Sequence, residues 1–175
     1  MMEALKAINT RRSVRKYKKK KVPKKIIKEL INAARNAPSS YNEQPWVFIT
    51  ITDKEKLRKI AEPEEQKSNF LKDAPLVIAC CYDEKKSSTK IHNLENVAVA
   101  AENILIAANA LGLGACYVTA FTSKYPVIEK RIRKVLKLPG NVHPVCLITI
   151  GYPDEEPVDK EMRPLKEVWK KEEYV

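Results

Sequence analysis

The 175-residue sequence is poor in the residues that build several common kinds of site. It has four glycines, two histidines and four cysteines, and no two cysteines form a C-x-x-C pair. Zinc and iron–sulfur centres need clusters of such ligands, so neither is expected. The cysteines fall in apolar stretches typical of strands, which predicts reduced, buried thiols rather than disulfides. They are Cys80, Cys81, Cys116 and Cys146.

Long apolar runs are also missing. No stretch reaches the roughly 18 apolar residues of a membrane span. The first residues, Met1–Lys6, lack the apolar core of a signal peptide. We therefore expect one cytoplasmic domain over residues 1–175, with residues 158–175 forming a polar tail that carries scattered apolar side chains.

Acidic residues are absent from one segment. Ten of the fifteen residues from Arg11 to Lys25 are Lys or Arg, and outside it 23 basic residues face 22 acidic ones. Nearly all of the net charge of +11 therefore lies in this segment. A local excess of positive charge favours a local anion over the broad basic face of a nucleic-acid-binding protein. A basic module that binds nucleic acid here, with strongly salt-dependent affinity, is the alternative from another class.

The pattern of apolar residues predicts helices that alternate with four strands, which favours an α/β or α+β sandwich. Helices are expected at 2–9, 24–36, 53–61, 93–111 and 122–136, and strands at 46–52, 76–82, 115–119 and 142–150. Pro126 is expected to interrupt the last helix early. The helix at 93–111 is apolar nearly all round, and a chain of this size covers such a helix poorly. A subunit partner is therefore expected to cover the rest of it.

Two segments carry groups suited to a ligand. Arg11, Arg12, Ser13 and Arg15 offer guanidinium donors and a hydroxyl that match phosphate oxygens. The alternative is a solvated basic arm, or a patch for nucleic acid or anionic lipid. The segment Pro38–Trp46 combines serine hydroxyls and a carboxamide that can hydrogen-bond a flat heterocycle, although a polar loop between helix and strand has the same composition. Together the two segments indicate a phosphorylated aromatic cofactor.

Four motifs in this order resemble the nitroreductase family of flavoproteins. They are R-R-S-x-R-x-Y at 11–17, P-S-S-x-N-x-Q-P-W at 38–46, A-L-G-L-G at 110–114, and I-G-Y-P at 150–153 with R-P-L at 163–165. The resemblance implies an α+β fold whose mostly antiparallel central sheet is flanked by helices. It also implies an obligate homodimer that binds two FMN molecules at its interface.

The same resemblance implies electron transfer from NADH or NADPH to FMN, and on to a nitroaromatic, quinone or flavin acceptor, by a ping-pong cycle. The flavin carries the chemistry, so no catalytic side chain is expected. Some family members instead dehalogenate aromatics or degrade a flavin, and the residues leave the acceptor open. The lysines Lys16 and Lys18–Lys21 are expected to be solvated, with steering of NAD(P)H as a possible added role.

The resemblance also assigns roles to individual residues. The phosphate and ribityl chain fall to Arg11, Arg12, Ser13, Arg15 and Arg163, and the pyrimidine edge of the flavin to Pro38, Ser39, Ser40 and Asn42. Arg15 also resembles the basic residue that reaches the polar edge of the flavin ring. Thr119 and Ala120 would approach the reactive flavin nitrogen, where many relatives carry a glutamate that this chain lacks. For Thr119 and Ala120 the alternative is a strand end in the core, and for Arg163 an exposed tail residue. Weaker candidates are Tyr41, Lys67 and Asn69.

Overall fold

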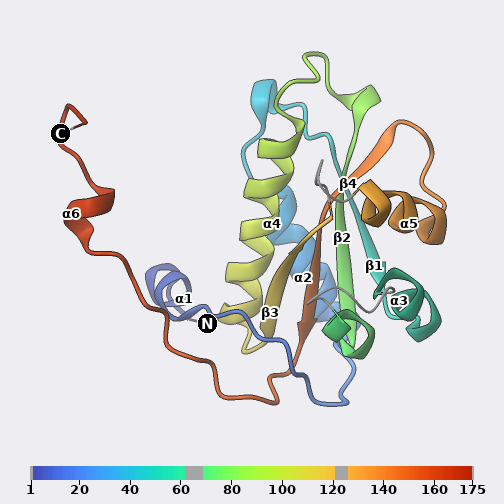
Figure 1. Ribbon diagram of the computed structural model, residues 1–175, viewed down its shortest axis with the longest axis horizontal. Coiled ribbons are helices and arrows are strands. Elements are labelled where there is room, and N and C mark those ends of the chain that lie inside the picture. The colour runs from blue at the N-terminus through green and yellow to red at the C-terminus, as the bar shows by residue number, and fades with distance from the viewer. Residues whose placement is uncertain (1, 62–68, 121–125, 175) are drawn as a thin grey trace.

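The computed structural model describes residues 2–61, 69–120 and 126–174 (Figure 1). The described helices are α1 (Ala4–Thr10), α2 (Lys24–Arg35), α3 (Lys54–Ala61), α4 (Asn93–Ala110), α5 (Pro126–Leu136) and α6 (Leu165–Val168). The strands are β1 (Trp46–Ile51), β2 (Leu76–Asp83), β3 (Gly114–Thr119) and β4 (Val142–Gly151), and short 3-10 turns are η1 (Ser40–Asn42), η2 (Asn69–Asp73) and η3 (Glu84–Lys86). These bounds lie close to the predicted ones. The expected start of the last helix at 122–123 falls outside the described residues. As described, the helix begins at Pro126, and proline is well tolerated in a first turn.

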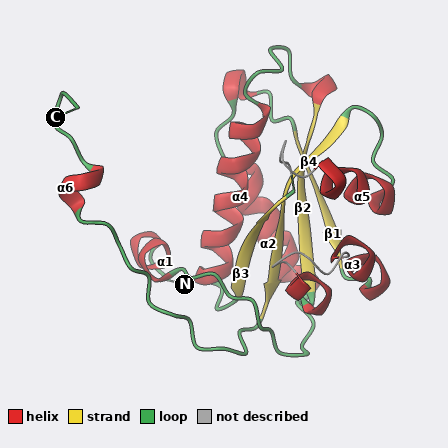
Figure 2. Ribbon diagram, viewed as in Figure 1, coloured by secondary structure: helices red, strands yellow, loops and turns green. Residues whose placement is uncertain are grey.

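The four strands form one antiparallel sheet in the order β1-β2-β4-β3. Helices α2 and α4 cover one face and α3 and α5 the other (Figure 2). Successive residues of β2 alternate between the two cores, so Ile78 packs under α4 while Val77 packs under α3 and α5. Because both faces are covered, β2 and β4 are apolar almost throughout. The predicted α+β architecture is confirmed.

The four cysteines are all free and buried, as predicted. Cys80 of β2 and Cys146 of β4 are cross-strand partners, so two of the thiols lie opposite each other in the sheet. Cys81 faces the other core. The thiols therefore serve as small apolar side chains.

Helix α4 spans about 27 Å and connects two distant parts of the molecule. At its start, the Asn96 side chain accepts a hydrogen bond from the Ser40 backbone N–H (2.9 Å, N to Oδ1). Near its end, Asn109 donates to the carbonyl of Ala7 in α1 (2.8 Å). Its outer side leaves Leu94 and Val99 about two-fifths exposed, at 40% and 42%. A single chain therefore leaves part of this apolar helix exposed, as predicted.

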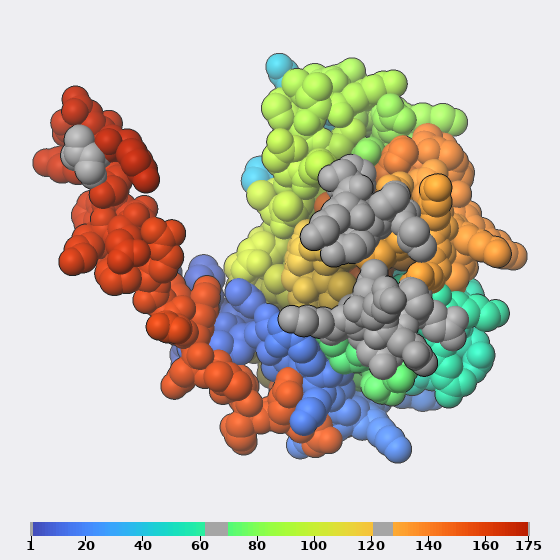
Figure 3. Space-filling model, in the orientation of Figure 1, coloured from blue at the N-terminus to red at the C-terminus, as the bar shows by residue number. Residues whose placement is uncertain are grey.

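The chain after β4 leaves the body of the molecule and ends in a projecting segment (Figure 1). We call residues 158–174 the C-terminal tail. Six large apolar side chains of the tail are exposed to solvent: Val158, Met162, Leu165, Val168, Trp169 and Tyr174. The space-filling view shows this segment standing away from the rest of the surface (Figure 3). Within the described parts of the chain, none of the helices has the length and apolar character needed to cross a bilayer.

Candidate functional site

Residues 11–18 form an extended segment, the N-terminal arm, that lies between the start of β3 and the chain after β4. On one side, Val14 N donates to Ala115 O (3.0 Å). On the other side, Lys18 N donates to Tyr152 O (2.9 Å) and Asp154 N donates to Lys16 O (3.0 Å). The arm is thereby joined by backbone hydrogen bonds to two neighbours, which fixes its path despite its high charge.

Four of the predicted residues come together on the outer side of this arm. Val14 points inward and is buried, whereas its neighbours Ser13 and Arg15 are exposed. A cavity of about 330 Å³ is lined by Arg11, Arg12, Ser13, Arg15, Glu155, Glu156, Val158 and Lys160. The predicted convergence of three guanidinium groups and a hydroxyl is therefore present in the fold.

The guanidinium groups retain unused hydrogen-bond donors. Arg12 donates through Nη1 to the carbonyls of Asn9 (2.9 Å) and Arg11 (3.0 Å), but its Nε is buried without a hydrogen-bond partner among the described residues. Arg11 makes one ion pair, with Glu102 (3.4 Å, Nε to Oε1). A buried donor without a partner costs free energy, and Arg12 also lines the cavity, where several guanidinium groups suit an anion.

Sequence reasoning missed the acidic side of the same cavity. The Glu155 carboxylate accepts hydrogen bonds from the backbone N–H groups of Arg15 (2.5 Å) and Lys16 (3.2 Å). This contact spans 140 residues of sequence, so no local pattern could have indicated it. Glu155 ties the start of the chain after β4 to the arm and offsets part of the local positive charge.

The loop Pro38–Asn42 has an unusual backbone. Tyr41 and Asn42 have φ angles of 52° and 55°, and Gln44 follows with 50°. Asparagine tolerates this left-handed region, but a tyrosine there is strained and is 81% exposed. Such strain needs support from surrounding contacts.

That support comes from polar contacts around the loop. Gln44 N donates to Ser39 Oγ (3.0 Å), and Gln44 Nε2 donates to Asn42 Oδ1 (3.1 Å). Asn96 holds Ser40 from α4. Sequence reasoning missed Asn96, although an amide in a mostly apolar helix is a signal that could have indicated it.

The arm and the loop lie at opposite ends of α4. Figure 1 shows η1 beside the start of this helix, whereas α1 and the arm lie beside its end. The contacts agree, because Ser40 meets Asn96 while Ala7 and Thr10 meet Asn109. A single chain therefore does not bring the two predicted halves of the site together.

The remaining predicted residues are dispersed. Ala120 is fully buried at the end of β3 and donates through its N–H to Val145 O (3.0 Å), whereas Thr119 is exposed. Arg163 lies in the tail, exposed, and pairs with Glu167 (3.2 Å, Nε to Oε2). Within one chain it does not meet the arm. Lys67 and the side chain of Asn69 lie outside the described part of the structure.

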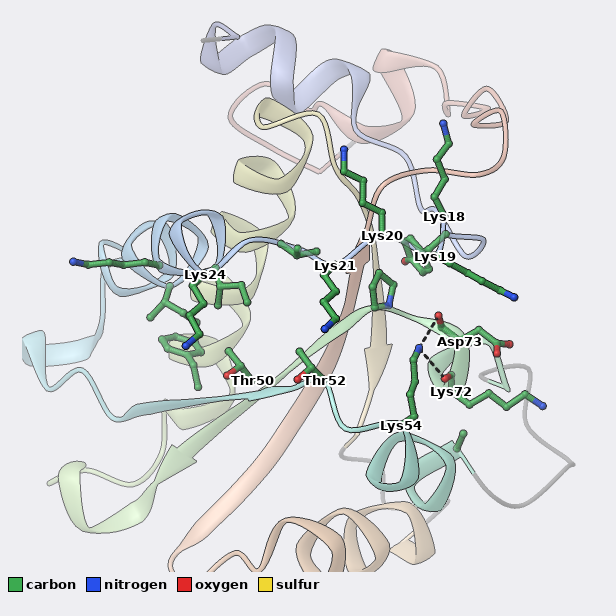
Figure 4. A pocket seen from close by; sticks show the side chains of 18 of the residues that line it. Lys18, Lys19, Lys20, Lys21, Lys24, Thr50, Thr52, Lys54, Lys72 and Asp73 are labelled. Atoms are coloured by element: carbon green, nitrogen blue, oxygen red, sulfur yellow. Dashed lines mark hydrogen bonds between the residues drawn. The ribbon is translucent and has the colours of Figure 1, made fainter.

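A larger groove of about 1740 Å³ runs along the β1 edge of the sheet, between α2 and α3 (Figure 4). Its rim carries the basic run of the sequence, Lys18–Lys21 and Lys24, and its floor includes Thr50 and Thr52. Lys54 donates to the carbonyls of Asp73 (3.2 Å) and Ala74 (3.0 Å), and desolvation lowers its pKa. The lysine run therefore borders a hollow while its residues remain exposed to solvent, as expected.

Comparisons with known proteins agree on one family. The model of the nitroreductase family matches residues 8–67 and 60–152. A Methanothermobacter thermautotrophicus protein described as a candidate NADH dehydrogenase/NAD(P)H nitroreductase is 37% identical over 163 residues, covering 92% of this chain and 83% of its own. The FMN reductase [NAD(P)H] of Bacillus subtilis is 26% identical, covering all of this chain and 76% of its own. The solved FMN-dependent nitroreductase of Clostridium difficile R20291 superposes with a TM-score of 0.85 at 33% identity, covering 97% of this chain and 99% of its own.

Proposed function

The chain belongs to the nitroreductase family, and we propose that it is an FMN-dependent oxidoreductase that takes electrons from NADH or NADPH. The observation that carries the proposal is the cavity where Arg11, Arg12, Ser13 and Arg15 converge. When bound, FMN supplies hydride acceptance from the nicotinamide and electron transfer to an acceptor. The similar FMN-dependent nitroreductase and FMN reductase support this cofactor.

The residues present fit the phosphate end of FMN. A terminal monophosphate needs charge-assisted donors, and Arg12 Nε is a buried donor that still needs an acceptor. Ser13 and Arg15 are exposed on the same side of the arm. Arg15 also lies over the ring of Phe70, with its guanidinium carbon 5.9 Å from the ring centre, so its position is constrained.

The other half of the site comes from a second copy of the chain. A two-fold dimer would place the Pro38–Asn42 loop of one subunit beside the arm of the other, giving two equal sites at one interface. Pro38, Ser39, Ser40 and Asn42 then border the pyrimidine edge of the ring, and Thr119 borders its reactive centre. Ala120 is buried with its N–H bonded to Val145 O, which fits the alternative role of a strand end in the core. The exposed apolar side chains of α1, α4 and the tail, among them Leu5, Val99 and Trp169, support such an interface.

The protein's role is to bind and orient. Donor and acceptor occupy the same ring face in turn, which gives a ping-pong cycle and requires no nucleophilic side chain. The positive arm and the loop donors favour the added negative charge of the reduced ring. Nitroaromatics, quinones and free flavins are the expected acceptors, and the lysines of the groove raise the local concentration of anionic NAD(P)H.

The first experiment is spectroscopic. The purified protein is expected to be yellow, or to become so with FMN, and to bind FAD more weakly. Anaerobic NADH or NADPH should bleach the flavin band, and a nitroaromatic or quinone should restore it. Equal affinity for FAD, or binding of neither flavin, would contradict the proposal. Salt-sensitive nucleic-acid binding without flavin binding would support the alternative class.

Subunit complementation tests the shared site. One variant carries Arg11→Ala, and the other carries Ser40→Ala with Asn42→Ala. After subunit exchange, each heterodimer has one site with both lesions and one with neither, so activity should reappear. A monomer that holds FMN, or a verified heterodimer without activity, would overturn the shared site.

A further inference from the structure

Two of the four glycines form a pair beneath the arm. Gly114 begins β3 and Gly151 ends β4, and the two are cross-strand partners in the sheet. A Cβ atom at Gly114 would lie 2.6 Å from the Cβ of Val14. A Cβ atom at Gly151 would lie 2.8 Å from the ring of Tyr17 and 2.5 Å from Pro75. The arm therefore rests directly on the backbone of the sheet at two points three residues apart.

The contact at Gly114 leaves little freedom. The atom that blocks it is the Cβ of Val14, which cannot swing away as the end of a long side chain could. Val14 is 3% exposed and is bound through its N–H to the carbonyl of Ala115. Any side chain at Gly114 must therefore displace the backbone of the arm or of β3.

The second contact is strengthened by a hydroxyl. The Tyr17 hydroxyl donates to the carbonyl of Val14, and its oxygen lies 2.7 Å from Oγ1 of Thr149 in β4. Thr149 is fully buried, so this pair joins the arm to the centre of the sheet. Tyr17 thus holds both ends of the segment Val14–Tyr17.

We propose that Gly114, Gly151 and Tyr17 are positioning residues that set where Ser13 and Arg15 present their donors to the phosphate of FMN. Ser13 and Arg15 flank Val14, so a shift of Val14 moves both. A displacement of about 1 Å is enough to spoil a set of directed hydrogen bonds. The inference rests on the proposed function, and it adds residues that do not themselves line the cavity of Arg11–Arg15.

The test compares FMN with riboflavin, which has the same ring but no phosphate. Gly114→Ala is expected to weaken FMN binding by about tenfold or more while riboflavin binding changes less than about threefold. Gly140→Ala is the matched control, because nothing lies within 4 Å of a Cβ there and its φ angle is not left-handed. Both dissociation constants are measured by flavin fluorescence with the apoprotein, together with its thermal midpoint.

Tyr17→Phe is the second variant, and it keeps the ring over Gly151. It should lower the preference for FMN over riboflavin by about three- to tenfold. If Gly114→Ala does not fold, Tyr17→Phe alone tests the positioning role. A preference unchanged in the variants that fold, or a parallel loss of both flavins, would overturn the positioning role. A wild-type protein without any preference for FMN would instead overturn the phosphate role of the arm itself.

Discussion

The N-terminal arm and the C-terminal tail are both exposed, charged segments outside the sheet, yet only the arm is fastened to it. The arm pairs its backbone with Ala115 and Tyr152 and buries Val14. The tail exposes large apolar side chains, and its helix α6 has only four residues, too few to be stable alone. The charged arm stays in place because its backbone is hydrogen-bonded and Val14 is buried. The apolar side chains of the tail are stable only when another surface covers them. For the tail we expect that surface on a second copy.

Removing the apolar side chains of the tail should weaken dimerisation, and this is the largest effect that we expect. The triple variant Leu165→Ser, Val168→Ser and Trp169→Ser is expected to weaken dimerisation at least about 100-fold, because each buried apolar side chain contributes about 1.5–3 kcal/mol. Sedimentation at several concentrations measures the change. The control replaces Lys166, Lys170 and Lys171 by serine and should remain dimeric. A triple variant that dimerises normally would show that the tail is only an exposed extension.

Removing a guanidinium group from the arm should weaken FMN binding without detaching the arm from the sheet. Arg11→Ala is expected to weaken FMN binding by about one to two decades, since charge-assisted hydrogen bonds contribute about 1.5–3 kcal/mol. The apoprotein should keep its thermal midpoint, because the ion pair to Glu102 is partly exposed. Flavin fluorescence titration gives the affinity. Lys18→Ala, on the same arm but not among the phosphate ligands predicted there, should leave the affinity unchanged. Equal losses in both variants would assign Arg11 only a diffuse electrostatic role.

Alkaline pH should lower the stability of the sheet and of the arm that packs on it, because both contain buried groups that ionise at high pH. Burial raises the pKa of Cys81 to about 12 and also raises the pKa of Tyr17 above its ordinary value. Unfolded thiols and phenols titrate near about 8.5 and 10, so their contribution is complete below about pH 8.5 and is lost as pH rises through the folded pKa values. Denaturant unfolding from pH 7 to 11 should show falling stability, and Tyr17→Phe should reduce the slope above about pH 10. A flat profile would contradict this.

The smallest expected effect on stability is at Arg163. Its pairing with Glu167, four residues further along the chain, is exposed, so Arg163→Ala should change the free energy of unfolding of the apoprotein by less than about 0.5 kcal/mol. Chemical denaturation measures this. A clear loss of FMN affinity in the same variant would place Arg163 at the phosphate, as the family resemblance implies. No loss would leave it an exposed tail residue.

The elements of the fold could be predicted because their signals are local. The apolar run of β2 and the helical period of α2 can be recognised from adjacent residues. Asp53 caps α3 by accepting from Glu55 N (2.9 Å) and Lys56 N (3.2 Å), which is also a local signal. Strand order could not be predicted, since it depends on contacts between distant segments. Nor could sequence spacing show that α4 separates the arm from the loop.

The site was predicted in part for the same reason. Arg11–Arg15 is one short segment, so its donors lie close together in space, and alternation along the extended backbone places Ser13 and Arg15 on the same side. Glu155 and Thr149 contact the arm across 140 and 132 residues, and neither belongs to a recognisable motif with it. Asn96 could be predicted only in part. A polar residue among the apolar residues of a helix needs a hydrogen-bond partner, but the sequence does not identify that partner.

The burial of all four native thiols has a practical consequence for studying the assembly. Thiol-directed labels react with accessible thiolates, so under native conditions the wild-type chain should take up little label. A cysteine introduced at an exposed tail position, such as Lys166→Cys, would then carry a spin label or dye almost exclusively. Pulsed dipolar spectroscopy between two such labels would measure how far apart the tails lie in the proposed dimer.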